Sequence, residues 1–217
     1  RREVPIDFFS WHTYGTVDVV AIEADFVDKT LQKYGFGDIE NHLTEWNLSH
    51  EKSKNVATSF ASANAMAMMQ ALQRTNTDML MYYDARPCGM NGIFKSYTYD
   101  RFKSYYTFIM FRDLRRLGTW VETRRLADEA FYSCAATDGK NAGVMVTYFV
   151  DDDTAPAKEI TLDFENVKSE NGVTLKYYLL DEEHDLELVK EEKYTSDKFS
   201  VNLTMDLYSS YYIKVTT

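Results

Sequence analysis

Hydrophobic positions follow two different rhythms along the chain. Up to residue 118, short apolar runs alternate with stretches in which apolar residues recur at helical spacing. The short runs predict three buried strands, over residues 6–12, 39–46 and 79–83. The periodic stretches predict three helices, over residues 19–34 and 55–73, and from Asp100, as the N-cap, to Gly118.

The two rhythms predict two kinds of structure. Strands that alternate with helices favour a parallel sheet with right-handed crossovers over residues 1–118. After residue 118 apolar and polar residues alternate one by one, for example over residues 160–164, 199–205 and 211–215, with turn signals such as "TDGKNAG" between the runs. This second pattern predicts an antiparallel β-sandwich over residues 119–217.

The net charge and the lengths of the apolar runs exclude some classes of binding partner. The chain has 24 Lys and Arg against 34 Asp and Glu, a formal net charge of −10, which disfavours binding to nucleic acid. No apolar run approaches the roughly 20 residues that span a bilayer, so no membrane segment is expected. Neither a cofactor motif nor a metal-ligand spacing is present, and the compartment stays open between cytoplasm and secretion. The acidic residues between 182 and 192 predict a solubilising surface on the sandwich.

Polar and aromatic side chains gather where each predicted strand hands over to its loop. The three segments read "SWHTYG", "LTEWNLS" and "MYYDARP". Carboxylates act as nucleophile or proton shuttle on glycosides, while aromatic rings stack on sugar faces. Taken alone, each residue also has an ordinary structural explanation: Glu45 could be a solvated loop residue, and His12 could be a hydrogen-bonded residue of the core. Together they are the kinds of side chain that a carbohydrate site requires, and the candidates are Glu45, His12, Tyr14, Trp46, Asn47 and Tyr83.

These segments, in this order, resemble the C-terminal part of a clan A glycoside hydrolase, most like family 39 (β-xylosidases and α-L-iduronidases). "DFFSWHTY" resembles the sixth strand of that family's barrel, "LTEWN" the seventh and "MLMYYDAR" the eighth. The resemblance covers nearly the whole chain, and its most specific part is Thr-Glu-Trp-Asn at a strand end. It implies the last three units of a (β/α)₈ barrel over residues 1–118, followed by a β-sandwich.

The resemblance also implies roles. Glu45 corresponds to the nucleophile of a retaining glycosidase acting on xylan-type or related plant glycosides. Tyr14 would hydrogen-bond that carboxylate, His12 would contact sugar hydroxyls, and Trp46 and Asn47 would line the site. Tyr83 stands where the family usually has a tryptophan as the sugar platform.

Only one of the family's two catalytic carboxyl groups has a counterpart in this sequence. The family's general acid/base belongs to an Asn-Glu-Pro motif on the fourth strand, and the sequence contains no such motif. A retaining glycosidase needs two carboxyl groups about 5–5.5 Å apart. We therefore expect a truncated fragment that is inactive alone. Because three βα units leave sheet faces and edges uncovered, we also expect self-association, with two half-barrels facing each other.

A non-enzymatic alternative remains open at this stage. The chain could be a carbohydrate-binding or structural sandwich module with a non-catalytic barrel remnant. Aromatic rows on sandwiches can bind glycans, and five tyrosines are available for one: Tyr177, Tyr178, Tyr208, Tyr211 and Tyr212.

Overall fold

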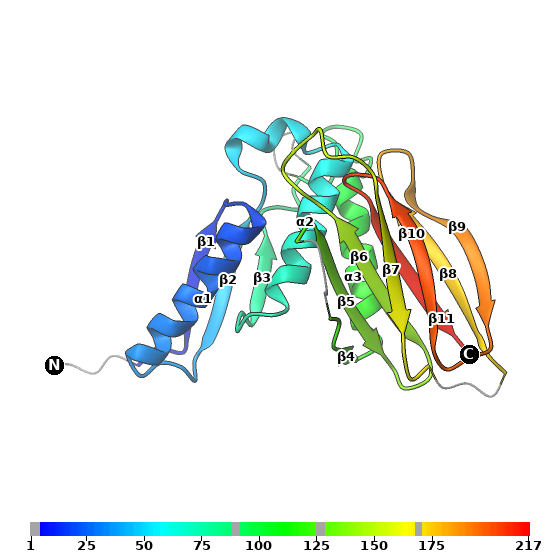
Figure 1. Cartoon of the computed structure of the whole chain (residues 1–217). Helices are drawn as coiled ribbons and strands as arrows, with labels where there is room; N and C mark the ends of the chain where they lie inside the picture. The colour runs from blue at the N-terminus through cyan, green and yellow to red at the C-terminus, as the bar shows by residue number, and fades with distance from the viewer. Residues whose placement is uncertain (1–4, 88–91, 125–128, 168–170) are drawn as a thin grey trace. The chain divides into compact units, whose positions relative to one another are not determined.

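The chain forms a mixed α/β structure of two compact units. The computed structural model describes residues 5–87, 92–124, 129–167 and 171–217. Residues 1–57 and 68–102 make up the first unit, and residues 58–67 and 103–217 the second (Figure 1). This division falls before the last helix, whereas the sequence predicts a boundary after it, at residue 118.

The first unit contains a parallel sheet of three strands. β1 (Phe8–Thr13), β2 (Glu40–Trp46) and β3 (Met79–Tyr82) pair in the order β1-β2-β3. Helix α1 (Val17–Lys33) joins β1 to β2 and buries Val17, Val20 and Ala24. A 3₁₀ helix, η1 (His50–Asn55), follows β2 and leads to helix α2 (Ser59–Leu72), whose last residues belong to this unit. The three predicted strands are confirmed.

Two predicted helix starts are wrong. Helix α2 begins at Ser59 rather than at Asn55, because the residues before it form η1 and a turn. Helix α3 (Lys103–Arg115) begins three residues after Asp100. Asp100 is therefore not its N-cap, and its carboxylate lies 4.0 Å from the Lys95 amine instead.

The second unit is built on two antiparallel sheets. The larger has the strand order β4-β5-β6-β11-β8-β9, and the smaller pairs β7 with β10. The bounds are β4 Thr119–Val121, β5 Phe131–Thr137, β6 Ala142–Tyr148, β7 Lys158–Phe164, β8 Val173–Leu180, β9 Asp185–Tyr194, β10 Phe199–Met205 and β11 Ser210–Thr216.

Side chains from both sheets share one core, which confirms the predicted β-sandwich. In β10, for example, Val201, Leu203 and Met205 are buried while the residues between them are exposed, as the alternation of apolar and polar residues predicts. Helix α3 packs against β5, β6 and β9 and buries Met110 and Leu114. This packing explains why α3 belongs to the sandwich unit.

The tyrosines of the sandwich serve mainly in packing. Tyr177 and Tyr212 are buried, at 0% and 3% exposed. Tyr208 donates a hydrogen bond to Asp153 at 2.7 Å, and its ring lies against Phe60 and Phe149. Tyr178 and Tyr211 are half-buried. The five tyrosines therefore do not form an exposed aromatic row.

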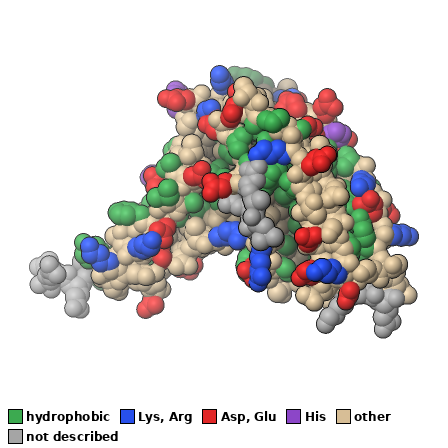
Figure 2. Space-filling model, in the orientation of Figure 1, with side chains coloured by type: hydrophobic (Ala, Val, Ile, Leu, Met, Phe, Trp, Pro, Cys, Tyr) green, Lys and Arg blue, Asp and Glu red, His purple; other side chains and the backbone are tan. Residues whose placement is uncertain are grey.

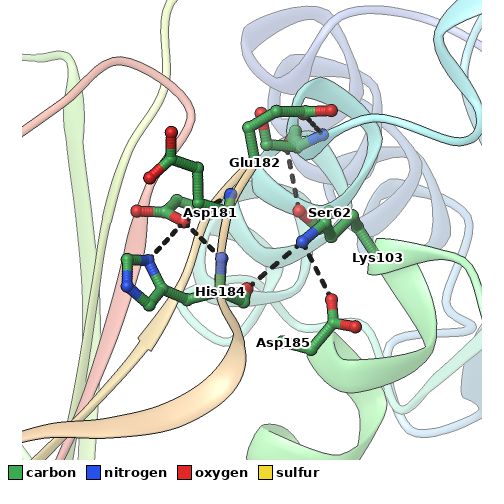
Figure 3. A network of polar contacts seen from close by, with 8 residues as sticks. Ser62, Lys103, Asp181, Glu182, His184 and Asp185 are labelled. Atoms are coloured by element: carbon green, nitrogen blue, oxygen red, sulfur yellow. Dashed lines mark hydrogen bonds and ion pairs between the residues drawn. The ribbon is translucent and has the colours of Figure 1, made fainter.

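A polar network surrounds the turn between β8 and β9 (Figure 3). Glu182 accepts a hydrogen bond at 2.8 Å from the backbone N–H of Ser59, the first residue of α2. The Lys103 amine lies 2.9 Å from the Asp185 carboxylate and donates to the backbone oxygen of His184. The prediction of a merely solubilising acidic surface is thus wrong for Glu182 and Asp185, which hold the turn to the starts of α2 and α3.

Candidate active site

The carboxyl ends of the three parallel strands meet at one edge of the sheet, as they must when strands run the same way. At this edge the Tyr14 hydroxyl, just after β1, donates a 3.0 Å hydrogen bond to Oε2 of Glu45, near the end of β2. Both side chains are half-buried. Two residues that lie 31 positions apart in the sequence are thereby joined at one point of the surface.

An extra residue in β2 decides where Glu45 points. Trp11 is the register partner of Leu43, but the next residue of β1, His12, is partnered by Glu45, so Thr44 is left over as a β-bulge. The Thr44 hydroxyl donates to the Trp11 backbone oxygen at 3.1 Å. Strict alternation would place Glu45 on the same face as Leu43, which is 0% exposed. The bulge instead turns Glu45 to the face that carries His12, a common use of bulges beside functional sites.

His12 and Tyr83 lie at the same edge. His12 is exposed, and its Nδ1 lies 3.3 Å from the Thr44 hydroxyl. Tyr83 directly follows β3 and is 36% exposed. Its backbone N–H donates to the Trp46 oxygen at 3.1 Å, which ties the end of β3 to the end of β2. Both side chains are thus accessible beside the Tyr14–Glu45 pair.

The electrostatics of the site favour a neutral phenol beside a carboxylate. Burial is the largest cause that raises the pKa of Tyr14 from 10.0 to about 12. The hydrogen bond to Glu45 and the charge of that carboxylate raise it further, and Tyr83 and Asp84 add smaller effects. Tyr14 therefore stays protonated over the physiological range and donates its proton to Glu45 Oε2. That donation fixes the direction of the carboxylate through Oε2 and does not involve Oε1.

A charged pair follows Tyr83 in the loop after β3. The Arg86 guanidinium binds the Asp84 carboxylate through Nε and donates to the Tyr83 hydroxyl at 3.1 Å. Its Cζ also lies 5.5 Å from the centre of the Tyr83 ring. From their place in the loop Asp84 and Arg86 could reach a substrate, but no motif in the sequence assigns them a role. The bulge at Thr44 leaves no periodic signal in the sequence.

The structure corrects the role expected for Trp46 and Asn47. Trp46 is 1% exposed and packs edge-on against the Tyr82 ring. Asn47 is 2% exposed, and its side-chain amide donates to the Tyr83 backbone oxygen at 2.6 Å. Neither side chain is open to a substrate. Both residues support the edge from inside, whereas His12, Tyr14, Glu45 and Tyr83 remain accessible.

A hollow of about 420 Å³ lies in the first unit, but at the opposite ends of the strands. It is lined by the start of β2, the loop before β3 and the end of α1. Its wall includes four carboxylates, from Asp28, Asp38, Glu40 and Asp78. The volume of this hollow does not make it the site, because none of the strand-end residues lines it.

Two kinds of feature, metal-binding clusters and membrane-spanning helices, were sought among the described residues. Within the described ranges, no three His, Cys, Asp or Glu side chains cluster closely enough to hold a metal ion. No helix among the described residues is long and apolar enough to cross a membrane.

Comparison with solved structures shows what the fold is similar to. A glucosidase from Croceicoccus marinus superposes with a TM-score of 0.84 at 17% identity, over 99% of this chain and 54% of that one. A GH39 enzyme from Xanthomonas axonopodis pv. citri gives 0.78 at 13% identity, over 98% and 55%. A monomeric β-xylosidase from Caulobacter crescentus CB15 gives 0.71 at 15% identity, over 98% and 56%.

These likenesses confirm the resemblance of the fold to clan A glycoside hydrolases. An endoxylanase of family 30 from Clostridium papyrosolvens C71 is also similar, with a TM-score of 0.66. The chain spans about half the length of the solved structures that it matches. No protein-family model and no curated protein matches the sequence.

Proposed function

We propose that this chain is the C-terminal part of a retaining glycoside hydrolase acting on O-glycosidic bonds of xylan-type or related plant glycosides. One observation carries the proposal: the Tyr14 phenol donates to the Glu45 carboxylate at the carboxyl edge of the parallel sheet. In this proposal β1, β2 and β3 are strands six to eight of a (β/α)₈ barrel, where catalytic groups project from the carboxyl ends of strands. The similarity to a glucosidase, a β-xylosidase and an endoxylanase supports this choice of reaction.

The proposed chemistry assigns one step to Glu45. An oxygen of its carboxylate attacks the anomeric carbon, the glycosidic C–O bond breaks, and a glycosyl ester of Glu45 forms. Water then attacks the same carbon, releases the sugar with retained configuration and regenerates the carboxylate. Tyr14 orients the nucleophile, the exposed His12 contacts sugar hydroxyls, and the ring of Tyr83 forms a platform for the sugar.

The departing oxygen needs a proton, and that general acid is the missing half of the pair. Asp84 is the nearest candidate in the loop after β3, but its carboxylate is engaged by Arg86 and its side chain is only 15% exposed. We therefore place the acid/base on a sequence outside this chain. Alone, the chain should hydrolyse ordinary aryl β-xylosides no faster than its Glu45→Gln variant.

A substrate with an activated leaving group separates the two halves of the mechanism. Dinitrophenolate departs without a proton, so dinitrophenyl β-xyloside should glycosylate Glu45 even though no acid is present. Intact-mass spectrometry should detect the ester, peptide mapping should assign it to Glu45, and added azide should release it as a glycosyl azide. The matched control is Glu51→Gln, which changes an exposed glutamate in η1 and should leave labelling intact.

Two results would contradict the proposal. If the chain forms no ester from activated xyloside or glucoside, or forms one elsewhere than at Glu45, the nucleophile is wrongly assigned. If the chain turns over an unactivated xyloside and loses that activity in Glu45→Gln, a second carboxyl group completes the site. The prediction that this chain holds only one of the two catalytic carboxyl groups is then wrong, although its assignment as a glycosidase stands.

A further inference from the structure

The hydroxyl of the bulge residue Thr44 makes two contacts that together decide where its hydrogen lies. It is 3.1 Å from the Trp11 backbone oxygen and 3.3 Å from Nδ1 of His12. A carbonyl oxygen can only accept, so the hydrogen between the two oxygens comes from Thr44, whose hydroxyl has a single one. The second contact therefore takes its hydrogen from the His12 ring.

This chain of hydrogen bonds indicates the tautomer of His12. A neutral imidazole carries one hydrogen, on Nδ1 or on Nε2, and the bond made by one nitrogen decides the form of the other. When Nδ1 donates to Thr44, Nε2 keeps its lone pair and can only accept. A neutral imidazole free in water favours the opposite form, with the hydrogen on Nε2, so the contact with Thr44 opposes the intrinsic preference of the ring.

The acceptor nitrogen of His12 lies on the face that carries Glu45. The two residues are register partners across β1 and β2, so their side chains are neighbours on one face of the sheet. His12 is exposed, and Figure 2 shows histidine side chains at the molecular surface. Among the residues that the structure describes, Nε2 has no hydrogen-bond partner. An accessible acceptor therefore stands beside the carboxylate.

We propose that Thr44 is a positioning residue of the candidate site: its hydroxyl holds His12 in the Nδ1–H form, so that Nε2 accepts a hydrogen bond from a sugar hydroxyl. The tautomer follows from contacts within this chain, whereas the recognition of a sugar rests on the proposed function. A hydroxyl can donate to Nε2, but a fluorine or methoxy group in its place cannot. The site thus requires a free hydroxyl at the position that faces His12.

The bulge at Thr44 then has two separable roles. The extra residue turns Glu45 to the face of His12, and the hydroxyl of that residue sets which nitrogen of His12 carries the hydrogen. Valine has nearly the same shape as threonine and also favours strands. Thr44→Val should therefore keep the first role and remove the second, while Thr44→Ser keeps the hydroxyl and serves as the matched control.

Nitrogen-15 NMR of the imidazole rings tests the tautomer without any substrate. At about pH 9 an ordinary imidazole is neutral, and its protonated and unprotonated nitrogens have well-separated resonances. Comparison with His12→Gln assigns the His12 signals among the four histidines. We expect mainly the Nδ1–H form in the wild type and in Thr44→Ser, and mainly the Nε2–H form in Thr44→Val.

The pKa of Tyr14 reports whether the bulge is intact in the valine variant. It should stay at about 12, because Glu45 still accepts the hydrogen bond of the phenol. A fall in that pKa would overturn the proposal, since Thr44 would then act through the direction of Glu45. So would a wild type mainly in the Nε2–H form, a valine variant that keeps the Nδ1–H form, or a serine variant that loses it.

Dinitrophenyl xylosides in which each hydroxyl in turn is replaced by fluorine test the recognition of the sugar. The electronic effect of fluorine on the glycosylation of Glu45 is common to both chains and cancels when the wild type is compared with Thr44→Val. At the position that faces His12, fluorine should slow labelling about three- to tenfold more in the wild type, the factor for one ordinary hydrogen bond.

The two experiments fail independently. Equal effects of fluorine in both chains at every position would overturn the recognition of a hydroxyl by Nε2, although the proposed function would stand. If no xyloside labels Glu45, the proposed function fails, and the NMR measurement still decides whether Thr44 sets the tautomer of His12.

Discussion

Replacement of Asn47 tests whether its buried amide holds the edge of the candidate site together. The side-chain amide donates to the Tyr83 oxygen at 2.6 Å, and its own oxygen accepts from the Leu48 N–H at 2.6 Å. Asn47 is 2% exposed and Leu48 is 6% exposed, so the bond between them is buried, whereas the bond to Tyr83 is partly buried. Asn47→Ala leaves the Tyr83 carbonyl and the buried Leu48 N–H without these partners, so we expect a loss of about 1–3 kcal/mol in the free energy of unfolding.

Asn47→Asp sharpens the test because it changes the donor and almost nothing else. At neutral pH the introduced carboxylate cannot donate, and it sets a charge against the Tyr83 carbonyl in a buried position. We expect a loss of about 3–5 kcal/mol, larger than that of the alanine variant. Burial raises the pKa of the introduced carboxyl above the usual value of about 4. Once protonated, the acid can donate to Tyr83 as the amide did, so stability should return as the pH falls.

Urea unfolding followed by tryptophan fluorescence measures these changes where they occur. Trp11 and Trp46 both belong to the first unit, and a Trp120→Phe background removes the signal of the second. The aspartate variant should regain free energy of unfolding as the pH falls from the pKa of the introduced carboxyl in the folded chain to its pKa in the unfolded chain. The gain is about 1.4 kcal/mol for each pH unit between these two values, and a measurement at about pH 5 should detect it. The alanine variant, measured against the parent chain, should not change with pH. An equal loss for both variants at both pH values would refute this role of the Asn47 hydrogen bond.

Two further predictions concern single contacts. Glu45→Gln should lower the pKa of Tyr14 from about 12 but leave it above 10.0, because burial is the largest cause of the shift. Near-ultraviolet titration against a Tyr14→Phe reference checks this. In the parent chain the raised pKa means that Tyr14 contributes stability below pH 10.0, and this contribution is lost as the pH rises towards about 12. Glu182→Ala should cost about 1 kcal/mol and speed hydrogen exchange at the Ser59 amide, since it removes the acceptor at the start of α2. Glu183→Ala is the control, and equal effects of the two variants would contradict the assignment.

Local patterns in the sequence are enough for most of the secondary structure. The alternation over residues 199–205 predicts β10 with its buried and exposed sides, because a strand points successive side chains to opposite faces. The order of strands and helices likewise predicts the parallel pairing of β1, β2 and β3. The Tyr14–Glu45 bond agrees with the contact implied by the motifs at the strand ends.

Contacts between distant segments decide what the local patterns leave open. The leftover Thr44 is visible only in the register between β1 and β2, yet it determines which face receives Glu45. The sequence marks Trp46 and Asn47 as site residues, whereas packing against Tyr82 and Tyr83 makes them interior supports. Glu182 likewise serves the start of α2 from a turn 123 residues away.

The sequence alone thus determined the kinds of elements, their order and the strand ends where chemistry was to be sought. Tertiary structure alone decided the direction of Glu45, the burial of its neighbours and the partners of the charged turn. The physical reason is the range of the forces concerned. Propensity and periodicity act over a few residues, whereas register, burial and hydrogen bonding depend on segments that meet only in the folded chain.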